Sequence, residues 1–409
     1  MSMFSLVWNY LKAKPLNTVL NIILLALGIA MITVLLLFNN QLQEKISTNA
    51  KGIDLVVGAK GSPLQLILCN IFQIDFPTGN IKLSEAEKVV RHRMVKKAIP
   101  LALGDNYKGY RIVGTKRTYA ELYNGDLAEG KWWKKDLEVT VGATAAKLTG
   151  LIIGDSFTSA HGLTSEGHDH ENKRYRVVGI LKPANNVMDN LILTNVESIW
   201  NVHKAYDSIA IVPQQPSSIV ASVEQGDSVR EITSLLIQYR NPLAVIQLPR
   251  FVNNNSSLQA ASPAFEIARL FSIMGVGAEL LGGFAFVLIF ISGLSIFIAL
   301  YNSLKERRYD LAIMRSMGAS RNKLFVFIVM EGSFLTLLGS LFGLVFGHGV
   351  LWIFTVWVVE SQKTGVSAAV FYVAEVYILA GSILLGMLCS IIPAIEAYRT
   401  DIHKVLAGN

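Results

Sequence analysis

Cysteine and charged residues are both scarce in this sequence. Its 409 residues include two cysteines, and charged residues make up 16% of the chain, whereas soluble domains contain about 25%. Cys69 lies in a polar segment and Cys389 in an apolar one, so we expect no disulfide between them. Hydrophobic residues make up 52% of the chain, and the shortage of charge argues against a wholly soluble protein.

The sequence also contains no phosphate-binding loop of the form GxxxxGKS or GxxxxGKT. The stretch GAKGSP at residues 58–63 has a different spacing, so we do not expect this chain to bind ATP in that way. The net charge is +7, but many basic residues gather at the ends of the apolar segments. They form no stripe with interleaved aromatic residues, and we therefore predict no nucleic-acid partner.

Long apolar runs are what the sequence does contain. A membrane-spanning helix needs about 20 predominantly apolar residues. We predict transmembrane helices at residues 16–38, 264–303, 324–358 and 372–395. The first part of the second segment carries Glu266 and Arg269, so we expect it to extend beyond the bilayer as a stalk. Residues 1–15 are amphipathic, which predicts a helix lying in the cytoplasmic interface.

Basic residues indicate the orientation of these segments. The loop at residues 304–323 contains six of them, and the loop before the last segment contains one, Lys363. The positive-inside rule therefore places residues 304–323 and both chain termini in the cytoplasm. With four spans, the polar region at residues 39–263 must lie outside the cytoplasm.

The polar region 39–263 alternates strand-like and helix-like runs. Runs rich in valine and isoleucine predict strands at residues 53–59, 110–115, 137–143, 175–181 and 190–195. Other runs predict helices at residues 84–98, 142–150 and 227–240, and residues 251–263 are expected to form a linker. The predicted fold class is a membrane protein of four transmembrane α-helices, with a large α+β extracytoplasmic domain between helices 1 and 2.

One segment of the polar region is rich in histidine. His161, His168 and His170, together with Asp169, fall within ten residues. Imidazole and carboxylate groups are ligands for zinc and other divalent metals, so these three histidines are candidate metal ligands. The alternative is a solvated hairpin loop without metal, and the sequence leaves both interpretations open.

Glycine recurs at every fourth position of the third apolar segment, at Gly339, Gly343 and Gly347. This GxxxG pattern provides a surface for close helix packing. The contact is either within one subunit or with a second copy or partner.

The basic loop at residues 304–323 is also amphipathic. Its apolar residues are Leu311, Ile313, Met314 and Met317. Gly318 is suited to end a helix and Ser320 to begin the next one. An apolar face beside basic residues predicts a docking surface for another protein; the alternative is an ordinary basic loop that only fixes topology.

Residues 306–332, ERRYDLAIMRSMGASRNKLFVFIVMEG, resemble the signature of FtsX-like permeases, the MacB and LolE type of ABC transporter. Asp310 stands where that family usually has glutamate. The tail from Pro393, PAIEAYRTDIHKVL, resembles the family's closing motif with Ile402 in place of proline, so the signature region covers residues 306–403. The stretch VTVGATAAKLTGLIIGDSF resembles part of the MacB-like periplasmic core domain.

The resemblance implies a non-catalytic permease subunit in the cell inner membrane, with a periplasmic outer domain and both termini in the cytoplasm. In this family the loop after the second span is a coupling helix that contacts a separate cytoplasmic ATPase, of which two copies are expected. ATPase motion then reaches the outer domain by mechanotransmission. The residues implied in ATPase coupling are Glu306, Arg307, Asp310, Leu311, Ile313, Met314, Arg315, Met317 and Gly318.

Further partners implied by the resemblance are a second permease copy or paralogue, membrane lipids, and a periplasmic accessory or substrate protein. The implied function is export or extraction of a peptide, lipoprotein or similar cargo. Two alternatives stay open: an FtsX-like transducer that activates a periplasmic partner, and a permease of a zinc-linked system. No cofactor other than zinc is expected on this chain, because ATP would bind to the partner.

Overall fold

The computed structural model describes residues 3–161, 173–207, 230–357 and 366–399. The chain folds as two compact units. The helical unit comprises residues 1–42 and 273–409, and the sheet unit comprises residues 43–272. Of the predicted metal ligands, His168 and His170 lie outside the described residues.

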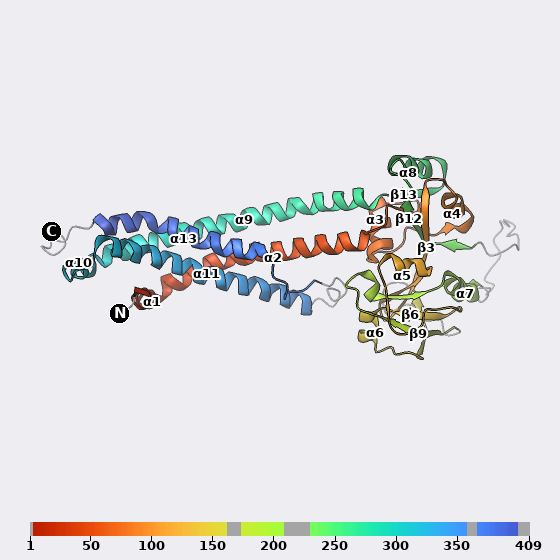
Figure 1. Ribbon diagram of the computed structural model, residues 1–409, viewed down its shortest axis with the longest axis horizontal. Helices are drawn as coiled ribbons and strands as arrows, with labels where there is room; N and C mark the ends of the chain where they lie inside the picture. The colour runs from red at the N-terminus through yellow and green to blue at the C-terminus, as the bar shows by residue number, and fades with distance from the viewer. Residues whose placement is uncertain (1–2, 162–172, 208–229, 358–365, 400–409) are drawn as a thin grey trace, which may run out of the picture. The chain divides into compact units, whose positions relative to one another are not determined.

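Long apolar helices make up the helical unit (Figure 1). Within the described residues, four helices are long and apolar enough to cross a membrane, namely α2 (Pro15–Ala50), α9 (Pro263–Glu306), α11 (Arg321–Trp357) and α13 (Val373–Arg399). Two short helices accompany them, α1 (Met3–Ala13) and α10 (Arg308–Ser316). Together with the mixed sheet described below, these helices confirm the predicted fold class.

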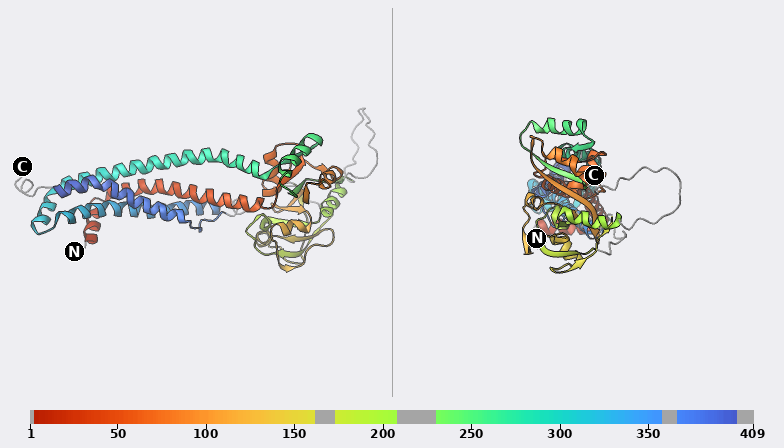
Figure 2. Two further views of the ribbon diagram at one scale, coloured as in Figure 1. Left: turned by 45° about the horizontal axis from the view of Figure 1, so that its top comes forward. Right: turned by 90° about the vertical axis from the view of Figure 1, so that its right-hand side faces the viewer.

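Helices α11 and α13 lie side by side (Figure 2). Their close approach depends on glycines that face each other, Gly332 on α11 and Gly386 on α13. A Cβ atom added at Gly386 would lie 2.7 Å from the carbonyl oxygen of Gly332. Side chains larger than hydrogen would therefore separate the two helices.

The predicted glycine stripe of α11 packs against α2 of the same chain. A Cβ atom added at Gly339, Gly343 or Gly347 would lie 2.8–2.9 Å from side-chain atoms of α2. The α2 residues concerned are Leu25, Ile29 and Thr33. These contacts support the first of the two interpretations of the stripe, packing within one subunit.

The sheet unit contains one large mixed sheet. Its strands are β1 (Leu55–Ala59), β3 (Val95–Tyr107), β4 (Tyr110–Gly114), β5 (Leu127–Gly130), β6 (Glu138–Val141), β7 (Ser156–Phe157), β8 (Ala160–His161), β9 (Tyr175–Leu181), β10 (Leu191–Thr194), β12 (Ser234–Tyr239) and β13 (Leu258–Ala261). Strands β2 (Ile81–Lys82) and β11 (Glu231–Ile232) form a separate pair. The short helices of this unit are α3 (Pro63–Ile67), α4 (Leu83–Val90), α5 (Arg117–Leu122), α6 (Ala143–Thr149), α7 (Val196–Asp207) and α8 (Ala244–Asn255), with a π-helix η1 (Leu68–Phe72) and a 3₁₀-helix η2 (Val187–Asn190).

The strand order of the large sheet is β13-β1-β12-β3-β4-β10-β6-β9-β5, with β8 paired to β3 and β7 paired to β9. Strand β10 is parallel to β4, and β6 is parallel to β9, while the other pairs are antiparallel. Sheets of mixed direction with helices in the connections are typical of α+β domains. Strands β1, β4, β6, β9 and β10 lie within the predicted strand segments.

Strand β12 corrects one prediction. Residues 227–240 were expected to form a helix, whereas residues 234–239 form a strand between β1 and β3. Leu235 and Ile237 enter one hydrophobic cluster and Leu236 enters another, so both faces of the strand are buried. A strand buried on both faces shows a continuous apolar run instead of alternation, which explains the wrong prediction.

Two further expectations were wrong for related reasons. Residues 251–263 are not a linker, because they contain the end of α8 and the strand β13, which pairs with β1. The helix expected at residues 84–98 is α4, which ends at Val90, and β3 begins at Val95. In both segments long-range strand pairing overrides the local sequence pattern.

Candidate functional site: the loop between α9 and α11

The loop between α9 and α11 contains a short helix and a tight turn. Helix α9 ends at Glu306, and α10 begins two residues later at Arg308. Gly318 has a φ of 101°, a left-handed conformation that favours glycine. The Ser320 hydroxyl accepts a hydrogen bond of 3.3 Å from the Lys323 N–H and so caps the start of α11. The predicted helix and turn are therefore present.

One face of α10 packs on the helical unit itself. Leu311 and Ala312 are buried, with 3% and 0% exposure. Leu311 belongs to a hydrophobic cluster that includes Leu304 of α9 and Leu324 of α11. The side chain of Leu311 therefore holds α10 on the ends of the long helices and does not lie on the exposed surface of the loop.

The opposite face of α10 is exposed. Tyr309, Ile313 and Met317 are 59%, 37% and 82% exposed, and Asp310 lies beside them. We call these four residues the coupling surface. Among the other predicted coupling residues, Gly318 is exposed, whereas Met314 and Arg315 are half-buried. Tyr309 was not among the predicted coupling residues, although it lies four residues before Ile313 and therefore on the same face of a helix.

Three consecutive residues join this loop to three different helices. Glu306 forms an ion pair with Lys14, directly before α2. Arg307 lies 3.3 Å from a carboxylate oxygen of Glu331 in α11. The next residue, Arg308, lies 2.5 Å from a carboxylate oxygen of Glu396 in α13. The loop is therefore tied to α11, to α13 and to the residue directly before α2.

The pair between Arg307 and Glu331 is the most withdrawn from solvent. The two side chains are 12% and 4% exposed, whereas those of Lys14 and Glu306 are 36% and 58% exposed. Exposed pairs contribute about 1 kcal/mol or less, but loss of one partner of a buried pair leaves an uncompensated charge. Arg307 and Glu331 therefore fix the position of the loop relative to α11.

The sequence-predicted histidine site lies elsewhere, in the sheet unit. Backbone pairing places His161 of β8 opposite Asp105 of β3. Asp105 is fully buried. Its Oδ1 lies 3.5 Å from Nε2 of His203, and its Oδ2 accepts a hydrogen bond of 3.2 Å from Ser159.

The charge of Asp105 also acts on Tyr175. Burial raises the pKa of Tyr175 well above its ordinary value, and the negative charge of Asp105 adds to that rise. Among the described residues, no group of three or more metal-binding side chains occurs, so the metal site stays a prediction.

Comparison with known proteins identifies the family. A family model for the MacB-like periplasmic core domain matches residues 18–239, and one for the FtsX-like permease C-terminal region matches residues 282–402. The chain belongs to the family of MacB-type, FtsX-like ABC transporter permeases. It is a membrane protein of this type, with apolar helices and a domain of the periplasmic type.

Curated relatives agree with this family. The chain is 25% identical over 247 residues to an uncharacterized ABC transporter permease of Methanocaldococcus jannaschii, MJ1507, covering 58% of this chain and 56% of that protein. It is 22% identical over 426 residues to the macrolide export ATP-binding/permease protein MacB of Wolinella succinogenes, covering 97% of this chain and 59% of the relative. The chain therefore spans less than two thirds of the length of these relatives.

Two solved structures with detectable likeness are a periplasmic and an extracellular domain. The periplasmic region of MacB from Actinobacillus actinomycetemcomitans is 12% identical, with a TM-score of 0.33, and the match covers 55% of this chain and 97% of that structure. The extracellular domain of the transporter YknZ from Gram-positive bacteria is 12% identical with a TM-score of 0.30, covering 51% of this chain and 99% of that domain.

Proposed function

We propose that this MacB-type permease passes the motion of a separate cytoplasmic ATPase to its outer domain, by mechanotransmission. The observation that carries the proposal is the loop between α9 and α11, where ion pairs join an exposed coupling surface to residues of α11 and α13 and to the residue directly before α2. A force applied to α10 therefore reaches the whole helical unit through Glu306, Arg307 and Arg308. The permease itself performs no chemical reaction in this scheme.

Helix α9 supports this proposal by its length. It contains 44 residues, which at about 1.5 Å per residue gives roughly 66 Å, about twice the hydrocarbon thickness of a bilayer. A single residue, Arg307, separates α9 from α10. A continuous helix of this length transmits displacement well, because every internal backbone hydrogen bond resists its extension.

The names of the relatives support the partners in this proposal. Two MacB relatives are described as combined ATP-binding and permease proteins, so an ATP-binding partner fits this chain. We propose two ATPase copies, a second permease copy or paralogue, and a periplasmic accessory or substrate protein. The site of action is the inner membrane, with both termini cytoplasmic, and the cargo is a peptide, lipoprotein or similar molecule that is exported or extracted.

A pair of substitutions in the coupling surface tests the proposal. Ile313→Asp combined with Met317→Asp places two charges on exposed positions without disturbing the buried side of α10. ATP hydrolysis that copurifies with the tagged permease from its native membranes should fall at least tenfold, because charge on an apolar docking face costs several kcal/mol. The control is Ile152→Asp, an exposed apolar position of the sheet unit. Undiminished ATP hydrolysis in the double variant would contradict the proposal.

Two alternative functions are distinguished by other measurements. A periplasmic hydrolase or coiled-coil protein that binds the full-length permease would favour an FtsX-like transducer. A zinc-linked system would draw on His203, whose Nε2 lies 3.5 Å from Oδ1 of Asp105, the residue that backbone pairing places opposite His161. Isothermal titration of the full-length protein with zinc should then give binding heat that His203→Ala reduces, and the absence of any heat would end the zinc alternative.

A further inference from the structure

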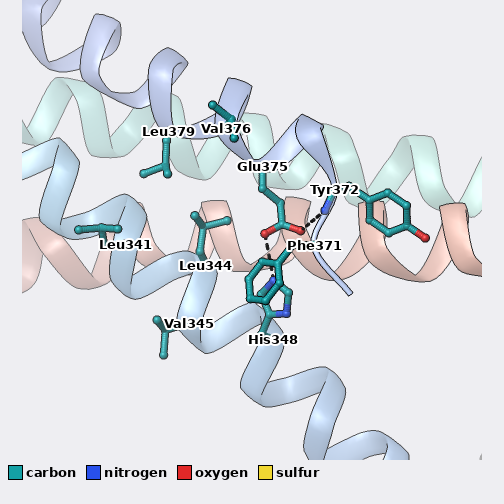
Figure 3. Close-up of a pocket in the computed structure, with 9 residues that line it drawn as sticks. All are labelled: Leu341, Leu344, Val345, His348, Phe371, Tyr372, Glu375, Val376 and Leu379. Carbon is teal, nitrogen blue, oxygen red and sulfur yellow. Dashed lines mark hydrogen bonds and ion pairs between the residues drawn. The ribbon is translucent and has the colours of Figure 1, made fainter. Parts of the chain in front are cut away.

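A second polar network joins α11 to α13 at the ends that are distant from α10 (Figure 3). His348 of α11 lies with Nε2 at 3.1 Å from Oε2 of Glu375, in the first turn of α13. The other ring nitrogen, Nδ1, lies 2.6 Å from the carbonyl oxygen of Ala368. The N–H of Tyr372 donates to Oε1 of Glu375 at 3.0 Å. We call this network the His348–Glu375 link.

The same segment is also bound to α2. The side-chain amide of Gln41 donates to the carbonyl oxygen of Ser367 at 2.8 Å and accepts from the Ser367 N–H at 2.8 Å. Gln41 is 5% exposed. Residues 366–372 are therefore held between α2, α11 and α13 by hydrogen bonds, and the ring centroid of Phe371 lies 4.6 Å from that of His348.

Apolar side chains surround the link. A cavity of about 450 Å³ lies beside it. Its apolar lining residues are Leu341, Leu344, Val345, Phe371, Val376 and Leu379. The titratable groups among the described residues of the cavity and the link are His348, Glu375 and Tyr372, whereas α2 contributes the neutral Gln41. Uncompensated charge in such surroundings is unfavourable.

Hydrogen-bond geometry fixes the number of protons in the link. The Ala368 carbonyl only accepts, so Nδ1 of His348 must carry a hydrogen and donate it. Nε2 of His348 and Oε2 of Glu375 are within hydrogen-bond distance, and one hydrogen must lie between them. The link is therefore complete when the His348–Glu375 pair carries this shared hydrogen in addition to the one on Nδ1. In that state the pair is electrically neutral.

Removal of this proton breaks one of the two contacts of His348. If Nδ1 keeps its hydrogen, a lone pair of Nε2 faces the carboxylate of Glu375. If the hydrogen moves to Nε2, a lone pair of Nδ1 faces the Ala368 oxygen. Neither tautomer satisfies both neighbours, so loss of the proton costs the link one hydrogen bond.

We propose that the His348–Glu375 link is a proton-dependent switch that fastens residues 366–372 to α11 and α13. The link forms when the pair is protonated and opens as rising pH removes the proton. Opening detaches residues 366–372 from His348 and releases the wall of the cavity that Phe371 and Tyr372 provide. This inference concerns the helical unit alone and does not require the ATPase coupling proposed above.

Glu375→Gln provides a sharp test, because glutamine imitates the protonated pair. Its carbonyl oxygen can accept from the Tyr372 N–H, and its NH₂ group can donate to Nε2 of neutral His348. This variant should keep the link closed at every pH. His348→Leu should keep it open at every pH, and Glu396→Gln, at the opposite end of α13, is the control.

Hydrogen exchange of the peptide covering residues 366–380 measures the link in the full-length protein. Comparison of the natural protein with Glu375→Gln at the same pH cancels the intrinsic pH dependence of exchange. The natural protein should match Glu375→Gln at about pH 6 and exchange roughly fivefold faster at about pH 9, as expected for one lost hydrogen bond. Strand β12 should exchange equally in all variants, which verifies folding.

Two results would overturn the proposal. One is an exchange ratio between the natural protein and Glu375→Gln that stays constant from about pH 6 to about pH 9. The other is His348→Leu exchanging as slowly as the natural protein at low pH, since the link would then contribute nothing. Both results are independent of any ATPase measurement, so they separate this proposal from the proposed function.

Discussion

Arg307 and Glu331 form an ion pair in which one guanidinium nitrogen lies 3.3 Å and 3.4 Å from the two carboxylate oxygens. Both side chains are largely withdrawn from solvent. The pair joins the residue that links α9 to α10 with a residue inside α11. It therefore connects the coupling surface to the bundle at the most buried of the three contact points.

Arg307→Ala should lower the stability of the protein strongly. The substitution leaves Glu331 buried without its partner, which costs about 3–5 kcal/mol in comparable pairs. Arg308→Ala is the matched control, because its pair with Glu396 is more exposed and should cost about 1 kcal/mol or less. Thermal unfolding of the purified protein in detergent measures both. Equal melting temperatures for the two variants would contradict this account of the loop.

The glycine stripe on α11 gives a second prediction. Gly343→Ala should destabilise the helical unit, because the added Cβ would lie 2.8 Å from Ile29 and 2.9 Å from the backbone oxygen of Ala26. Gly349→Ala meets nothing within 4 Å, so it should be neutral or stabilise by up to about 1 kcal/mol through helix propensity. Melting temperatures of the two variants provide the measurement. A tolerated Gly343→Ala would show that α2 does not pack here.

Cys69 gives a third prediction. Its thiol is buried, and Nη1 of Arg111 lies 3.5 Å from the sulfur. Burial raises the pKa of the Cys69 thiol, and Arg111 opposes that rise less strongly. The reactive thiolate is therefore scarce even at about pH 8.5, where an ordinary thiol is half ionised. A maleimide reagent should label Cys69 only after denaturation, and rapid labelling of the native protein would contradict the described core.

The parts of the fold that sequence alone predicted are those specified locally. Four spans follow from the length of apolar runs, and the turn at Gly318 follows from residue type. The strand β12 was missed because Leu235, Leu236 and Ile237 are all buried, so no period-two pattern marks it.

The contacts that position the loop could not be predicted in the same way. Lys14 and Glu306 are 292 residues apart in the sequence, and nothing local pairs them. Leu311 was expected on the exposed face of α10, but a helix of nine residues beside a bundle buries one apolar stripe in its own chain. His348 and Glu375 were overlooked because each is a single polar residue in an apolar segment.

The orientation of the chain across the membrane is the central claim, since an ATPase can reach the coupling surface only from the cytoplasm. The most direct measurement uses Ser316→Cys in the loop and Ser156→Cys in the sheet unit, both at exposed positions, with Cys69 and Cys389 replaced by alanine. An impermeant maleimide applied to intact spheroplasts should label the cysteine at 156 and leave the one at 316 unlabelled until the membrane is opened. Labelling at 316 without labelling at 156 would contradict the account.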